Sequence, residues 1–167
     1  SNIFNKAVEW GVINCRNPLR HVKRFKENNV RVRFLTNGEI MLLVQHADAR
    51  LRDIIVVALH TGMRRGEIQK MRRGHINFSN NVIAIPDQKN GETSYIPMSK
   101  SCRQVLLKYS DLGDDAQFFG YDFSSTFERL VKLLEIPNFH FHDLRHTFAS
   151  YLVMNGIDLN TVRELLR

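Results

Sequence analysis

The stretch HFHDLRHTFASYLVMNG, residues 140–156, combines the pattern of a core helix with a cluster of cationic side chains. A helix from about His142 to Met154 carries its apolar residues on one side, at Leu144, Phe148, Tyr151 and Leu152. Asn155-Gly156 can end this helix. At its start, His142 and Arg145 are three residues apart and share a face, so both side chains can contact one phosphate group.

The histidines of this stretch allow another interpretation. His142 and His146 are four residues apart, which is also the spacing of a metal-binding pair on a helix. A metal-dependent phosphohydrolase that uses His140, His142, Asp143 and His146 is therefore an alternative. We expect no metal site, because no cysteine or carboxylate-rich cluster elsewhere completes the ligand set, and we interpret His146 and His140 as structural.

A second cationic string lies earlier in the chain: Thr61-Gly62-Met63-Arg64-Arg65-Gly66-Glu67-Ile68. Arg64 follows a glycine break, so its side chain and the first amides of a new helix can face an anion together. Glu67, three residues on, can reach Arg64 and orient it. The alternative is a surface helix with a routine ion pair.

Lys89 lies in Asp87-Gln88-Lys89-Asn90-Gly91-Glu92, where Asn90-Gly91 is typical of a β-hairpin turn. A lysine on a hairpin is commonly a solvated surface residue. Its flexible ammonium group can also enter a minor groove and protonate a leaving oxygen, as a mobile general acid does.

The other segments predict helices around one small sheet. Thr36 and Glu39 have the capping-box spacing of a helix that runs through Val44. An apolar helix, 52–59, is expected to end at Thr61-Gly62 and to be central in the core. Alternating residues predict strands at 76–78, 82–85 and 94–98. Further helices are expected at 63–71, at 99–109, after Ser125 with Glu128 completing a capping box, and after Asp158. The expected fold class is mainly α, with a three-stranded antiparallel sheet.

The composition is that of a globular protein with a cationic surface. Hydrophobic residues make up 43% of the 167 residues and charged residues 25%, which suits one folded domain. Lys and Arg number 24 against 17 Asp and Glu, so the net charge is +7. Nucleic-acid-binding proteins share this balance with membrane-surface and heparin-binding proteins.

Other features exclude several classes of protein. The longest apolar run, Ile54 to Leu59, is far shorter than the roughly 20 residues that cross a bilayer, so we expect no membrane span. Cys15 and Cys102 lack the spacing of a disulfide framework or a zinc site. The first residues do not resemble a secretory signal, and a cytoplasmic location fits best.

Taken in chain order, the Thr-Gly-x-Arg-x-x-Glu string, the hairpin lysine and the His-x-Leu-Arg-His string resemble the tyrosine recombinase and phage integrase family. The resemblance covers about Phe34 to Arg167, and the last string is its most specific part. It implies a helical catalytic domain at residues 35–167. Residues 1–34 would then be the end of a core-binding-domain helix and a basic interdomain linker, which either contacts the DNA backbone or is a solvated strap.

The resemblance also implies the roles of individual residues. Arg64 and Arg145 would hold the non-bridging oxygens of a scissile phosphate, where two planar guanidinium groups stabilise charge without a metal or another cofactor. Lys89 would protonate the departing 5′ oxygen. His142 would assist proton transfer and phosphate binding, and Glu67 would support the pocket.

The reaction implied is site-specific recombination of double-stranded DNA through a 3′-phosphotyrosyl intermediate, by a homotetramer on DNA. Arg64, Arg65, Lys89 and Arg145 would contact the DNA. In the family the nucleophilic tyrosine follows the last helix, and this sequence stops at Arg167 before it, so the fragment by itself is expected to be inactive. Tyr151 is interpreted as a core residue. The alternative is a non-catalytic DNA-binding protein with the same fold.

Overall fold

The computed structural model describes residues 2–18, 22, 33–86 and 93–166. The chain divides into two compact units, Ser1–Arg31 and Val32–Arg167. The described part of the first unit contains helix α1 (Asn2–Glu9), in which no residue is buried. Most of the expected basic linker, residues 19–21 and 23–32, lies outside the described residues.

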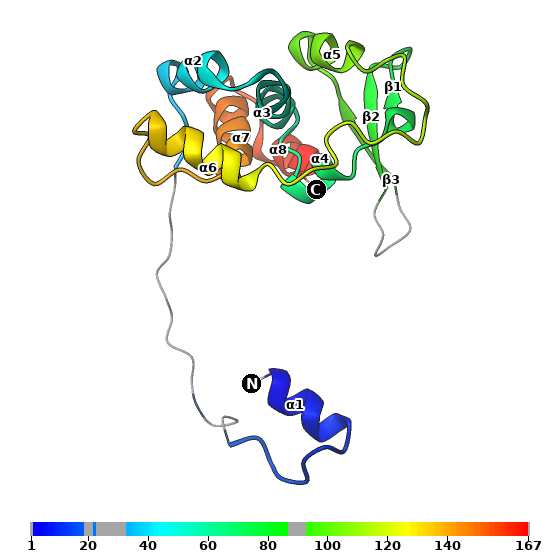
Figure 1. The fold of residues 1–167 in the computed structure, drawn as a ribbon, viewed down its shortest axis with the longest axis vertical. Coiled ribbons are helices and arrows are strands. Elements are labelled where there is room, and N and C mark those ends of the chain that lie inside the picture. The colour runs from blue at the N-terminus through cyan, green and yellow to red at the C-terminus, as the bar shows by residue number, and fades with distance from the viewer. Residues whose placement is uncertain (1, 19–21, 23–32, 87–92, 167) are drawn as a thin grey trace. The chain divides into compact units, whose positions relative to one another are not determined.

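The second unit is a helical domain with a small sheet (Figure 1). Its described helices are α2 (Asn37–His46), α3 (Ala49–Thr61), α4 (Arg65–Gln69), α5 (Lys100–Leu107), α6 (Ser124–Leu133), α7 (Asp143–Met154), α8 (Leu159–Leu166) and the 3₁₀ turn η2 (Arg73–His75). Strands β1 (Ile76–Asn77), β2 (Val82–Pro86) and β3 (Thr93–Pro97) form an antiparallel sheet in the order β1-β2-β3. The expected fold class is therefore confirmed.

Helix α3 is central to the core, as its apolar sequence predicts. It packs against α2, α5 and α7, and Figure 1 shows it between α7 on one side and α5 on the other. Five of its apolar side chains are at most 1% exposed: Leu51, Ile54, Ile55, Val57 and Ala58. The helix begins at Ala49 because the Asp48 carboxylate accepts the amides of Arg50 and Leu51. No described helix, α3 included, is long and apolar enough to cross a membrane.

The sheet follows the predicted alternation. Ile83 in β2 pairs with Ile76 in β1 and with Ile96 in β3, and all three side chains are buried. The turn between β1 and β2 contains Asn81 with a positive φ of 57°, which asparagine tolerates better than most residues. The predicted hairpin turn at Asn90-Gly91 lies outside the described residues.

Helix ends test the local capping predictions. Thr36 and Glu39 form the expected capping box, and the Asp158 carboxylate accepts the amides of Asn160 and Thr161. Ser125 does not cap α6, which begins at Ser124. Phe123, which precedes it, is fully buried, and the Asp122 carboxylate accepts the Ser124 amide at 2.9 Å. The side chain that accepts a first-turn amide of this helix is therefore Asp122, not Ser125.

Tyr151 is a second correction. Its side chain is only partly buried, and its hydroxyl donates to Asn37 Oδ1 at 2.8 Å on the neighbouring α2. A phenol whose hydroxyl has a polar partner at the surface does not need complete burial. Tyr151 is thus a contact between α7 and α2 rather than a core residue.

Candidate active site

Arg145 lies in the first turn of α7, and its guanidinium reaches the end of α3. Nη1 donates to the carbonyl oxygen of Gly62 at 2.7 Å, and Nη2 donates to the carbonyl oxygen of Leu166 in α8. Gly62 has a positive φ of 62° and ends α3, which lets the chain turn toward α4. Two carbonyls from different helices therefore set the orientation of the Arg145 guanidinium.

Arg64 directly precedes α4, two residues after Gly62. The Glu67 carboxylate accepts from Arg64 Nη1 at 2.9 Å and from the Arg64 backbone amide at 2.7 Å. The Arg64 side chain is 52% exposed, so this pair leaves part of the guanidinium accessible to solvent. The Arg64 backbone amide is bonded within the protein, since it donates a hydrogen bond to Glu67 Oε2.

His142 is an exposed residue at the start of α7. Its ring packs edge to face on the ring of His146, with the two ring centroids 5.0 Å apart. Partial burial lowers the pKa of His142 below its ordinary value, and the charges of His146, Arg145 and Arg64 lower it further, whereas Asp143 raises it. Arg64 and Arg145 therefore both act electrostatically on one imidazole. Two segments far apart in the sequence bring their cations together, as the two strings suggested.

This proximity gives a direct test in the chain itself. Replacing Arg64 with alanine is expected to raise the pKa of His142, because a positive charge that disfavours the imidazolium is lost. Titration of the His142 ring protons by NMR measures this shift. Arg65→Ala is the matched control, because Arg65 Nη1 donates to Ser124 Oγ in α6. This variant should leave the pKa of His142 unchanged. Equal curves for wild type and Arg64→Ala would contradict the geometry.

A cationic groove of about 760 Å³ extends from Arg64 along α4 to the sheet. Its charged or titratable lining residues are Arg64, Glu67, Lys70, Arg72 and His75. The opposite wall comes from β2 and β3, at Ala84, Ile85, Pro86 and Ser94. Sequence reasoning missed Lys70 and Arg72, although the run Lys70-Met71-Arg72-Arg73 was a visible signal. Lys89, which follows β2 in the chain, lies outside the described residues.

The histidines differ from the expected structural role in their exposure. His140 and His146 are both exposed, and His146 packs its ring on that of His142. Among the described residues, no group of three or more His, Cys, Asp or Glu side chains is arranged to hold a metal ion.

Comparison with known proteins matches this chain and its fold to one family. The model of the phage integrase family matches residues 23–167. The shufflon-specific DNA recombinase of Escherichia coli is 35% identical over 90% of this chain and 40% of its own length. The curated relatives are longer, and the chain spans 40 to 58% of them.

Two solved structures have the same fold. The catalytic domain of bacteriophage HP1 integrase is 26% identical, with a TM-score of 0.66 over 81% of this chain and 80% of that one. The Tn1549 transposon integrase, in complex with circular intermediate DNA, is 21% identical, with a TM-score of 0.70 over 99% of this chain and 67% of that one. The chain therefore belongs to the phage integrase family, that of the tyrosine recombinases.

Proposed function

We propose that the whole protein is a site-specific DNA recombinase that breaks and rejoins double-stranded DNA through a 3′-phosphotyrosyl intermediate. This chain supplies the phosphate-binding part of the catalytic domain. The observation that carries the proposal is that Arg145 reaches the carbonyl of Gly62, two residues before Arg64, and that the charges of Arg64 and Arg145 both act on His142. The similarity to a recombinase at 35% identity supports the reaction class.

The chemistry requires a site that stabilises negative charge on a phosphodiester. A tyrosine oxygen attacks phosphorus, the bond to the 5′ oxygen breaks, and the departing oxygen takes a proton. Arg64 and Arg145 hold the two non-bridging oxygens, where charge accumulates during displacement. Glu67 supports this by fixing Arg64 through its backbone and side chain. The 5′ hydroxyl of a partner strand then reverses the step, so bond energy is conserved without a nucleotide cofactor.

Proton transfer is assigned to His142 and Lys89. Partial burial and the charges of His146, Arg145 and Arg64 lower the pKa of His142, which favours the neutral imidazole that can accept a proton. Lys89 is proposed to protonate the 5′ oxygen, from its place in the sequence between β2 and β3. These two strands form one wall of the groove that begins at Arg64.

The DNA contact surface is proposed to include Arg64, Arg65 and Arg145, with Lys89. The groove adds Lys70 and Arg72, whose charges lie near Arg64. Residues 1–34 are proposed to be the end of a core-binding-domain helix and a basic interdomain linker, and residues 35–167 to be catalytic domain. We further propose a homotetramer on DNA and a cytoplasmic location, where the protein meets its DNA substrate.

A nicked suicide duplex tests the reaction, because loss of a short 5′ fragment after cleavage prevents religation and traps the covalent adduct. The whole protein is expected to form a DNA adduct that survives denaturation and that proteolysis reduces to a phosphotyrosyl peptide. Gel-shift titration with the same duplex measures binding in parallel. Binding without any adduct would instead support the non-catalytic DNA-binding alternative.

A further inference from the structure

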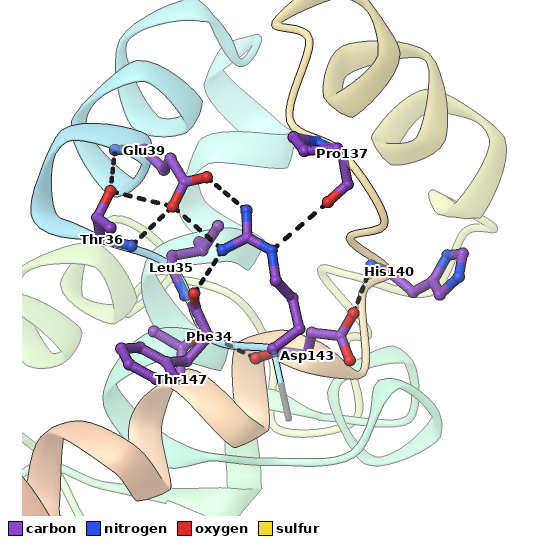
Figure 2. A network of polar contacts seen from close by, with 9 residues as sticks. Phe34, Leu35, Thr36, Glu39, Pro137, His140, Asp143 and Thr147 are labelled. Carbon is purple, nitrogen blue, oxygen red and sulfur yellow. Dashed lines mark hydrogen bonds and ion pairs between the residues drawn. The ribbon is translucent and has the colours of Figure 1, made fainter. Parts of the chain in front are cut away.

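The segment that leads into α2 is fixed against the rest of the domain (Figure 2). Arg33 donates through Nη1 to the Phe34 carbonyl at 2.6 Å and to Glu39 Oε2 at 3.3 Å, and through Nη2 to Glu39 Oε1. Its Nε donates to the Pro137 carbonyl at 3.5 Å. The hydrogen bond from Arg33 lowers the pKa of Glu39 to about 2, so this pair stays charged at physiological pH.

Thr147 connects this segment to α7 through a buried hydroxyl. The backbone amide of Leu35 donates to Thr147 Oγ1 at 3.0 Å, and Thr147 Oγ1 donates to the Asp143 carbonyl oxygen at 2.8 Å. Leu35 is 0% exposed and Thr147 1% exposed. A buried amide must have an acceptor, so the hydroxyl ties the segment before α2 to the first turn of α7.

Asp143 is fixed from a second side by the turn that precedes α7. Its Oδ2 accepts from the backbone amide of His140 at 2.7 Å, as Figure 2 shows. Asp143 lies directly after His142 and two residues before Arg145, and the amide of Arg145 donates to the His142 carbonyl at 3.1 Å. The backbone between the two site residues is therefore held through the carbonyl that Thr147 contacts.

We propose that Thr147 is a positioning residue for the recombination reaction: its hydroxyl sets the place of the first turn of α7, and with it the approach of His142 and Arg145 to the phosphate. The inference rests on the function proposed above. Because Thr147 is only 1% exposed, its proposed action is through these two residues rather than by direct contact with DNA. Small displacements of reacting groups have large effects on rate, because the site must match the transition state closely.

Two substitutions separate the hydroxyl from the shape of the side chain. Thr147→Val keeps the shape and removes the acceptor for Leu35, whereas Thr147→Ser keeps the hydroxyl. In the whole protein, Thr147→Val is expected to slow single-turnover cleavage of the suicide duplex about 10- to 100-fold while DNA affinity changes by less than about twofold. Thr147→Ser is expected to restore the rate to within about threefold of wild type.

A matched control separates positioning from a general loss of stability. Tyr109→Phe removes the hydrogen bond, 2.9 Å long, from the Tyr109 hydroxyl just after α5 to Oδ2 of the buried Asp53 in α3. This variant is expected to melt at a lower temperature and to cleave at the wild-type rate. If Thr147→Val does not fold, Thr147→Cys, whose thiol bonds weakly, is expected to give an intermediate rate.

The outcomes distinguish this proposal from the function beneath it. If Thr147→Val cleaves at the wild-type rate, or if Thr147→Ser is as slow as Thr147→Val, the positioning role alone is overturned. A rate that falls only in proportion to melting temperature, as measured against Tyr109→Phe, would also overturn it. Absence of any adduct in the wild-type protein would instead remove the proposed function.

Discussion

Arg145→Lys in the whole protein is expected to slow cleavage of a suicide duplex at least about 100-fold, and Arg145→Ala about 1,000-fold or more. Arg145 uses two arms of its guanidinium for the carbonyls of Gly62 and Leu166, which sets the direction of the planar group. Lysine offers a single point charge without this fork, so it cannot reproduce both the anchoring and a bidentate contact with phosphate.

The measurement is the single-turnover rate of adduct formation, with duplex affinity measured by gel shift. Arg103→Lys is the matched control, because Arg103 Nη1 also donates to a backbone carbonyl, that of Phe78, at 3.0 Å. This arginine in α5 stacks near the Phe78 ring and does not line the groove. Arg103→Lys should cleave at the wild-type rate. Near-normal cleavage by Arg145→Lys would refute the assignment of Arg145 to the phosphate.

Gly62→Ala is expected to destabilise the domain by about 2–5 kcal/mol, the sum of a left-handed backbone cost of about 1–2 kcal/mol and an overpacking cost of about 1–3 kcal/mol. Gly62 has a φ of 62°, and a Cβ there would lie 2.5 Å from Phe148 Cδ1 on α7. Phe148 would have to move, and α7 carries Arg145, whose Nη1 binds the Gly62 carbonyl. The change therefore affects both stability and the site.

Urea denaturation of the chain measures the stability effect, and Gly156→Ala is its matched control. Gly156 has a φ of 81°, but a Cβ there meets nothing within 4 Å. Only the backbone cost of about 1–2 kcal/mol applies to it. Gly62→Ala should therefore lose more stability than Gly156→Ala. Equal losses in the two variants would show that α7 does not pack on Gly62 as described.

Helix caps could be predicted from the sequence because the residues that form them lie within three positions of one another. The Thr36 and Glu39 capping box and the Asp158 cap formed as their spacing predicts. The same reasoning was wrong at Ser125, because α6 begins at Ser124 and the Asp122 carboxylate accepts the Ser124 amide. A cap is worth about 1 kcal/mol, so the choice between neighbouring acceptors is a small energy difference that residue spacing alone does not fix.

The site residues, too, were only partly predictable from the sequence. The pairing of Glu67 with Arg64 followed from a spacing of three residues. The groove could not be predicted from local spacing, because its second wall comes from β2 and β3. Lys70 and Arg72 become groove residues only because that wall lies across from them. Thr147 also carried no signal in the sequence, since its partner Leu35 is 112 residues away.

The sequence by itself determined the helices, the sheet, the family and the residue types of the site, because periodicity, caps and short strings act over a few positions. Only the tertiary structure decided that Arg145 reaches the Gly62 carbonyl, 83 residues away, and so lies beside Arg64. Which helices meet depends on burial of apolar surface shared by the whole core, centred on α3. That shared burial overcomes the repulsion between cations and brings Arg64, Arg145 and His142 together.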